Sequence, residues 1–258
     1  MNILYSKNKE KFIVYHKLNA IEKKAPSLIF HHGLMSNMNG AKALYIEKYC
    51  KERGYNFIRF DNFGHGNSSG EFIDQTISSW LEGLSLVIDN LCDGPVILVG
   101  SSMGGWITML KSIENSQQII GMIAISAAPD FTEELMWNKI SVEQQENIVK
   151  DGVVNITGSD PNCGNAYPVS YGLIVDGRKY LLLNKKSIDI SCPVHLIHGM
   201  LDIDGPPDFN TLAGWCKLYH ISTENLTIGI LIKPIKAITE AGFSARNIFP
   251  ELLLIIAI

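Results

Sequence analysis

The sequence predicts an α/β fold in which helices flank a mostly parallel sheet. Short apolar runs alternate with longer segments whose apolar residues recur at helical spacing. One apolar run, residues 95–99, leads directly into a glycine-rich turn and then into a helical pattern. A chain of 258 residues can bury one full α/β core, so we expect a single domain over residues 1–258.

The first half of the chain predicts a regular order of strands and helices. Ala43, Ile46 and Tyr49 recur at helical spacing and Gly54 follows them, which predicts a helix over 40–53. The apolar run at 95–99 has the composition of a buried strand. The other expected elements are two strands within 2–17, strands at 27–31, 56–60 and 119–126, and helices at about 78–92 and 103–113.

The second half is less regular, and the alternation weakens over residues 130–190. We expect an inserted cap there, with a helical stretch at 132–150. Asp176-Gly177 fits either a hairpin turn or a helix C-cap, and both alternatives stay open. The expected elements that follow are a strand at 193–197, a helix at 208–219 and a strand at 226–232.

The chemistry is expected at Gly100-Ser101-Ser102-Met103-Gly104, named here the elbow. A Gly-x-Ser-x-Gly sequence between a strand and a helix places its central serine on a strained turn with the hydroxyl exposed. A serine hydroxyl needs a base to take its proton, and the reaction needs donors for the developing oxyanion. Ser102 is therefore the candidate nucleophile. The alternative is a glycine-rich turn that binds phosphate.

Two backbone N–H groups are the candidate oxyanion donors. One belongs to Met103, directly after the nucleophile, and the other to Leu34 in the loop after the third strand. Gly33 would let that loop turn toward the serine. The candidate acid is Asp202, which lies just past a strand, where catalytic groups gather in open α/β sheets. Asp204 and Asp208 compete with it.

The order of these motifs resembles the α/β-hydrolase superfamily. Within it, the chain is similar to bacterial relatives of the mitochondrial palmitoyl-protein thioesterase and acyl-glucuronide esterase subfamily. The resemblance implies serine-dependent hydrolysis of esters or thioesters without a cofactor, and a structural role for His65. It covers residues 1 to about 213, and its motifs are residues 33–43, 61–68, 100–106, 130–133 and 198–202.

The catalytic base departs from the family pattern. The family places a histidine after the last strand, in a Gly/Ser-Asp-His-Arg sequence, but residues 230–239 contain no histidine. His220 is the one histidine after Asp202, and it comes too early in the chain. It is the candidate base, with a surface histidine as the alternative.

A shifted reading frame near Lys233 would explain this atypical tail of about 214–258. Lys236-Ala237-Ile238-Thr239-Glu240 can be encoded by AAA GCG ATC ACC GAA. Without the first two bases, that sequence encodes Ser-Asp-His-Arg. Residues 248–258 also lack the amphipathic pattern of a final hydrolase helix.

Composition excludes several other classes of function. A net charge of −4 without a basic stripe argues against nucleic-acid binding. Five cysteines without a Cys-x-x-Cys pair predict neither a disulfide framework nor a metal site, and they favour a reducing, cytoplasmic location. The apolar C-terminal residues 252–258 are shorter than the ~20 residues of a membrane span.

Two functional hypotheses follow. The first is a hydrolase that cleaves small acyl esters or thioesters through an acyl-enzyme intermediate, with Ser102 as nucleophile and Asp202 as acid; its base is unassigned, and His220 is the candidate. The second is an inactive hydrolase fold that binds a ligand or is a degenerate gene product. A serine peptidase is a further alternative, because the same groups can attack amides. No cofactor or metal is expected, and the oligomeric state stays open.

Overall fold

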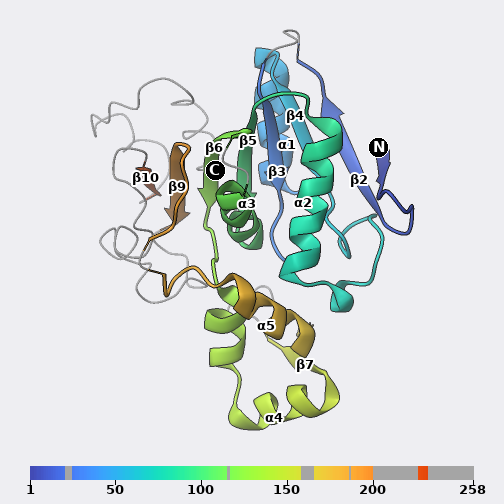
Figure 1. Ribbon diagram of the computed structural model, residues 1–258, viewed down its shortest axis with the longest axis vertical. Coiled ribbons are helices and arrows are strands. Elements are labelled where there is room, and N and C mark those ends of the chain that lie inside the picture. Colours follow the sequence, from blue (N-terminus) through green and yellow to red (C-terminus); the bar gives the residue numbers. More distant parts are fainter. Residues whose placement is uncertain (21–24, 115–116, 158–165, 186, 200–225, 232–258) are drawn as a thin grey trace.

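The structure is a computed structural model that describes residues 1–20, 25–114, 117–157, 166–185, 187–199 and 226–231. Its centre is an eight-stranded sheet with helices on both faces, which confirms the predicted α/β class (Figure 1). The strands are β1 (Asn2–Tyr5), β2 (Phe12–Leu18), β3 (Ser27–His31), β4 (Asn56–Phe60), β5 (Val96–Ser101), β6 (Ile119–Ile125), β9 (Val194–Gly199) and β10 (Leu226–Leu231).

The strand order is β1-β2-β4-β3-β5-β6-β9-β10. Every pair from β4 to β10 is parallel, and only β1 and β2 add antiparallel pairs at one edge. In parallel strands the carboxyl ends meet at one edge of the sheet. The loops after β3, β4 and β5 therefore share that edge, and β9 ends there.

Alternate residues of each buried strand face opposite layers of helices. Leu28 and Phe30 of β3 pack in the layer of α1 (Ala41–Arg53), whereas Ile29 packs in the layer of α2 (Ile77–Leu91) and α3 (Met103–Glu114). Figure 1 shows α1 behind the sheet and α2 and α3 in front of it. The sheet, including the edge where the carboxyl ends of its parallel strands meet, is therefore covered by a core on both faces.

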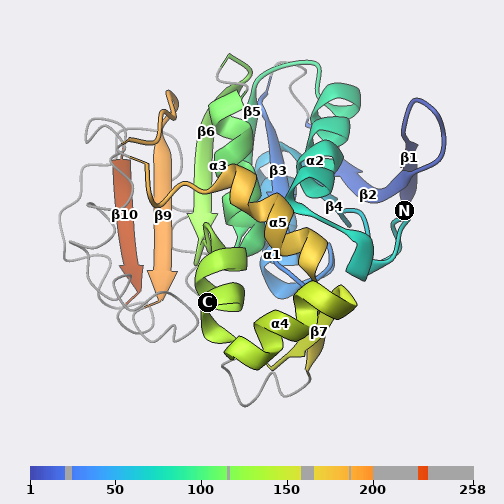
Figure 2. The ribbon, with the colours of Figure 1, turned by 60° about the horizontal axis from the view of Figure 1, so that its bottom comes forward.

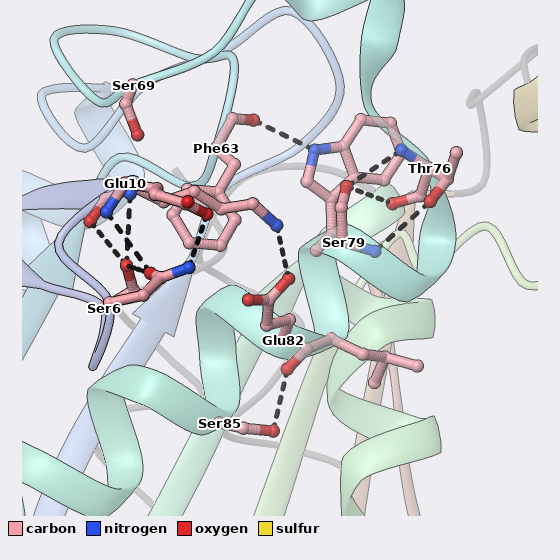
Figure 3. Close-up of polar contacts among 12 residues, drawn as sticks. Ser6, Glu10, Phe63, Ser69, Thr76, Ser79, Glu82 and Ser85 are labelled. Atoms are coloured by element: carbon pink, nitrogen blue, oxygen red, sulfur yellow. Dashed lines mark hydrogen bonds and ion pairs between the residues drawn. The ribbon is translucent and has the colours of Figure 1, made fainter.

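The start of α2 is fixed by local hydrogen bonds. Thr76 and Ser79 form a capping box, in which Thr76 Oγ1 accepts from Ser79 N–H and Ser79 Oγ accepts from Thr76 N–H (Figure 3). Trp80 Nε1 then donates to the Phe63 carbonyl oxygen at 3.1 Å. A short 3₁₀ turn, Phe72–Asp74, precedes the helix. These bonds join α2 to the loop after β4.

Residues 130–190 are named here the inserted segment, and its described residues, 130–157, 166–185 and 187–190, form a separate layer beyond the carboxyl edge. The arrowheads of β6 and β9 point toward it (Figures 1 and 2). Its elements are α4 (Val142–Asp151), α5 (Tyr171–Gly177), the antiparallel pair β7 (Val153–Ile156) and β8 (Tyr167–Ser170), and short helical turns at Thr132–Met136, Trp137–Lys139 and Arg178–Tyr180.

The predicted helical stretch at 132–150 is helical but interrupted. A π-helical turn and a 3₁₀ turn occupy 132–139, and α4 begins only after Ser141. Ser141 Oγ accepts from Gln144 N–H, so this serine caps a new helix rather than continuing an earlier one. The strand pair β7–β8 was not expected from the sequence.

Asp176-Gly177 is not a hairpin turn, because both residues lie in the last turn of α5. Gly177 also has a right-handed backbone, so it is not a left-handed C-cap. Asp176 accepts hydrogen bonds from Ser78 N–H at 2.7 Å and Ser78 Oγ at 2.8 Å. A Cβ at Gly177 would lie 2.2 Å from Thr132 Oγ1. Asp176 therefore binds α5 to α2, and Gly177 allows α5 to pack closely against Thr132.

A second carboxylate joins the two ends of the inserted segment. Asp130 is 1% exposed, and its oxygens accept from Leu182 N–H at 2.8 Å and Leu183 N–H at 2.8 Å. Asp130 itself has a left-handed backbone, with φ of 56°. Asp130 thus binds the two ends of the segment to each other, and Asp176 binds the segment to α2.

The contact of Asp176 with α2 can be tested by substitution. We expect Asp176→Ala to lower the free energy of unfolding by about 1–3 kcal/mol, because the partly buried Ser78 N–H loses its acceptor. We also expect faster limited proteolysis within the inserted segment. Asp151→Ala, at an exposed carboxylate of the same segment, is the control. Equal urea midpoints for the two variants would contradict this role.

Candidate active site

Ser102 lies between β5 and α3 with a strained backbone. Its φ is 53°, a left-handed conformation that non-glycine residues rarely adopt. Its N–H donates to the Ile125 carbonyl oxygen at 3.0 Å, and its own carbonyl oxygen accepts from Gly105 N–H at 2.8 Å. Such strain costs roughly 1–3 kcal/mol and persists only where the surroundings enforce it. The turn presents the serine at the carboxyl edge of the sheet.

The surroundings enforce this turn by direct contact between backbones. A Cβ at Gly104 would lie 2.3 Å from the His31 carbonyl oxygen and 2.6 Å from that of His32. A Cβ at Gly100 would lie 2.3 Å from the Gly104 carbonyl oxygen. Only glycine fits at either position without displacing backbone. The start of α3 is therefore packed onto the end of β3.

The loop after β3 passes beside Ser102. A Cβ at Gly33 would lie 3.2 Å from Ser102 Cβ and 3.8 Å from its Oγ. The loop then turns at Met35, whose φ is 56°, and Ser36 N–H donates to the Gly33 carbonyl oxygen. Leu34 is thus the next residue after the point of closest approach, and Met103 is the first residue of α3. Of the two predicted oxyanion donors, Met103 is adjacent to the serine in sequence, and Leu34 is adjacent to Gly33, which packs against the serine.

Two buried histidines hold the end of β3 against the loop after β4. His31 Nδ1 contacts the His32 carbonyl oxygen at 2.9 Å, and its Nε2 lies 2.8 Å from Asn62 Nδ2. His32 Nδ1 contacts the Gly33 carbonyl oxygen at 2.8 Å, and its Nε2 accepts from Asn62 N–H. A carbonyl oxygen only accepts, so each Nδ1 carries the proton and each Nε2 is an acceptor.

Both rings are therefore neutral and have no free nitrogen for a substrate proton. Burial lowers the pKa of His31 to about 3 and that of His32 to about 4. Neither ring fits a catalytic base. The role of this pair was not predicted, because its partner Asn62 is distant in sequence, although adjacent histidines at the end of a buried strand are a visible signal.

His65 is also built into the protein interior. Its Nδ1 donates to the Phe63 carbonyl oxygen at 3.1 Å, and its ring packs near His32, Phe72 and Trp80. Burial lowers the pKa of His65 to about 4. These contacts fit the structural role that the family resemblance implied.

The predicted acid and base lie outside the described residues. These are Asp202, its competitors Asp204 and Asp208, and His220, together with the atypical tail except for β10. Strand β9 ends at Gly199 beside β6, so the chain leaves the sheet at the same edge as the elbow. Among the described residues, no histidine ring forms a hydrogen bond with Ser102 Oγ.

Other kinds of site can be assessed only within the described ranges. No group of three His, Cys, Asp or Glu side chains there is placed to hold a metal ion. No described helix is long and apolar enough to cross a membrane. A surface hollow of about 370 Å³ lies on the inserted segment and does not include the elbow; its lining residues are Trp137, Val142, Gln145, Glu146, Val149 and Lys150.

Comparison with known proteins places these features in a family. The family model described as serine aminopeptidase, S33, matches residues 22–203. Human mitochondrial palmitoyl-protein thioesterase ABHD10 is 37% identical over 190 residues, which are 74% of this chain and 60% of that protein. The bovine protein of the same name is 37% identical over 182 residues, 70% of this chain and 58% of its own. The chain spans about three fifths of these curated relatives.

Solved structures agree with this assignment. Alpha/beta hydrolase domain-containing protein 10 from mouse superposes with a TM-score of 0.77 and 29% identity, covering 93% of each chain. A putative hydrolase from Agrobacterium vitis S4 gives a TM-score of 0.79 and 28% identity, covering 93% of this chain and 92% of its own. These likenesses extend over almost the full chain.

The buried histidines make stability depend on pH. An unfolded histidine has a pKa of about 6.5, whereas His31, His32 and His65 have folded pKa values of about 3, 4 and 4. Between about pH 6.5 and 4 the unfolded chain binds more protons, so the free energy of unfolding should fall as the pH falls. Each group contributes at most about 1.4 kcal/mol per pH unit.

Urea denaturation at a series of pH values measures this loss. Burial raises the pKa of Asp130 to about 6, so proton uptake by this carboxyl favours the folded state as the pH falls. This single opposing group is outweighed by the three histidines. His65→Phe should flatten the slope by roughly a third of the histidine contribution, since one titrating group is removed. Stability that stays constant from pH 6.5 to 5 would contradict the neutral, buried assignment.

Proposed function

Because the chain belongs to the serine aminopeptidase S33 family of α/β-hydrolases, we propose that it hydrolyses carboxylic esters or thioesters through an acyl-enzyme on Ser102. The observation that carries the proposal is the left-handed backbone of Ser102 at the junction of β5 and α3, with Gly33 packed beside it. A strained serine at this junction is the arrangement that presents a nucleophile.

In this mechanism Ser102 Oγ attacks the acyl carbon while a base takes its proton. The carbonyl oxygen becomes an oxyanion, which the N–H groups of Leu34 and Met103 stabilise. Collapse of the tetrahedral intermediate breaks the bond to the alcohol or thiol, which leaves with the proton. Water then repeats the sequence on the acyl-enzyme and frees the acid. Asp202 orients the base, and His220 is the proposed base.

The names of the relatives favour an acyl thioester as substrate. The chain resembles proteins called palmitoyl-protein thioesterases, and we extend that class of substrate to it as a proposal. The inserted segment lies at the edge that carries Ser102, so it is the proposed cap over the acyl group (Figure 2). Those relatives are named mitochondrial, whereas cysteine usage predicts a cytoplasmic location for this chain. The location stays a prediction.

The alternative is a fold that has lost its base. Its support is the sequence after Asp202, which offers His220 alone and lacks the expected Ser-Asp-His-Arg motif. A chain without a base would keep its pocket and its oxyanion donors but lose most of its turnover. Peptide hydrolysis is a further alternative, and the family description, a serine aminopeptidase, favours including it in the tests.

Labelling with a fluorophosphonate and turnover of p-nitrophenyl acyl esters test the proposal. We expect Ser102→Ala to abolish labelling and turnover, because no other residue would form the covalent adduct. If His220 is the base, His220→Ala should lower kcat by at least about 10³-fold. Ser191→Ala, at an exposed serine, and His16→Ala are the matched controls, since both residues lie outside the proposed machinery and should leave kcat within a few-fold.

Three outcomes distinguish the candidates. Folded wild-type protein that neither reacts with the probe nor turns over esters would overturn the hydrolase proposal in favour of the inactive fold. Turnover that survives His220→Ala would exclude this histidine as the base. Cleavage of aminopeptidase substrates in preference to palmitoyl thioesters would favour the peptidase. Sequencing the coding DNA decides separately whether a shifted frame contains a histidine.

A further inference from the structure

The loop after β3, residues 33–40, is named here the oxyanion loop because it carries Leu34. It leaves the sheet at Gly33 and returns to α1 at Ala41. Its inward point is Met38, which is fully buried, whereas Met35, Ser36 and Asn37 are exposed. Met38 is therefore the residue at which the middle of the loop enters the protein interior.

A buried carboxylate binds the N–H of this peptide. Asp61, directly after β4, is fully buried, and its Oδ1 accepts from Met38 N–H at 2.7 Å. Its Oδ2 accepts from Asn67 N–H at 2.9 Å. Distances this short fit charge-assisted hydrogen bonds. One carboxylate thus joins two loops that leave neighbouring parallel strands.

A guanidinium binds the carbonyl group at the other end of the same residue. Arg59 Nη1 donates to the Met38 carbonyl oxygen at 3.2 Å and to Asn39 Oδ1 at 2.7 Å. Arg59 Nε also donates to Glu47 Oε2 on α1 at 2.8 Å. The loop is therefore bound on both sides of Met38 by side chains of β4 and its continuation.

The fit around the carboxylate is tight. A Cβ at Gly66, whose φ is 53°, would lie 2.1 Å from Asp61 Oδ2. The chain closes over the carboxylate at this glycine, which leaves no room for a larger residue. Burial of a carboxylate is costly unless strong donors compensate it, and here the donors are backbone N–H groups of the two loops. An amide in its place would present an NH₂ group to one of those donors.

We infer that Asp61 is a positioning residue of the oxyanion hole, because it binds the loop that carries the Leu34 N–H. This inference rests on the proposed function of the Ser102 site. Asp61 contacts no reacting atom; it acts through Met38 on the placement of Leu34. A donor moved by a fraction of an ångström loses much of its effect on the transition state, whereas substrate binding elsewhere in the pocket is retained.

Asp61→Asn is the main test, with Asp89→Asn, at an exposed carboxylate on α2, as the matched control. We expect kcat for a p-nitrophenyl ester to fall by about 10–100-fold while KM changes by less than about 3-fold. In hydrogen-exchange mass spectrometry, peptides spanning 33–40 should exchange at least about 10-fold faster, whereas peptides of β5 should keep their protection.

Asn39→Ala gives a milder second variant. It removes only one of the two acceptors of Arg59 Nη1, at an exposed position, so the fold should persist even if Asp61→Asn fails to fold. We expect the same direction of change in both readouts with a smaller size. Unchanged exchange of 33–40 in the folded variants would overturn the inference, as would a rise in KM without a fall in kcat.

The two proposals fail in different ways. If wild-type protein shows no turnover, the proposed function fails, and the exchange of 33–40 alone still decides whether Asp61 holds the loop. If wild-type protein is active and Asp61→Asn has normal kcat and normal exchange, the positioning role fails while the hydrolase proposal stands.

Discussion

The contact of Gly104 with the carbonyl groups of His31 and His32 is the constraint on which the candidate site depends. Two backbones meet there with no side chain between them. This contact sets where α3 begins, and so where the strained turn at Ser102 lies. It also sets where the chain leaves β3, since Gly33 follows at once and lies against Ser102 Cβ. The serine and the oxyanion loop are therefore placed by one packing event.

Such close packing buries the side chains of His31 and His32, whose ring nitrogens must then form hydrogen bonds within the protein instead of with water. The two imidazoles do this by bonding to the backbone at one nitrogen and to Asn62 at the other. Gly83 of α2 makes room for Asn62, because a Cβ there would lie 2.0 Å from its Oδ1. Asn62 and Asp61 are neighbours in sequence, so one short loop after β4 supports both the histidine pair and the oxyanion loop. Loss of either partner would leave buried polar atoms without bonds.

Features that depend on local sequence were predicted well. The strand before the elbow, the helix after it and the helix that ends at Gly54 are confirmed, because apolar periodicity and glycine positions encode them directly. Features that depend on distant partners were not. Asp176 follows a helical pattern, but its role comes from Ser78, 98 residues away. The placement of Asp202 and His220 stays a prediction, since neither residue is among those described.

Asp130, which joins the two ends of the inserted segment, and Asp176, which binds it to α2, respond differently to acid. Burial raises the pKa of Asp130 to about 6, and the N–H groups of Leu183 and Leu182 only partly offset it. Burial also acts to raise the pKa of Asp176, but hydrogen bonds from Lys179 and Ser78 prevail and lower it. Near pH 6, Asp130 therefore takes up a proton and one of its acceptor oxygens becomes a hydroxyl. Asp176 stays ionised over the same range, so the hydrogen bonds that it accepts from Ser78 on α2 keep their charged acceptor.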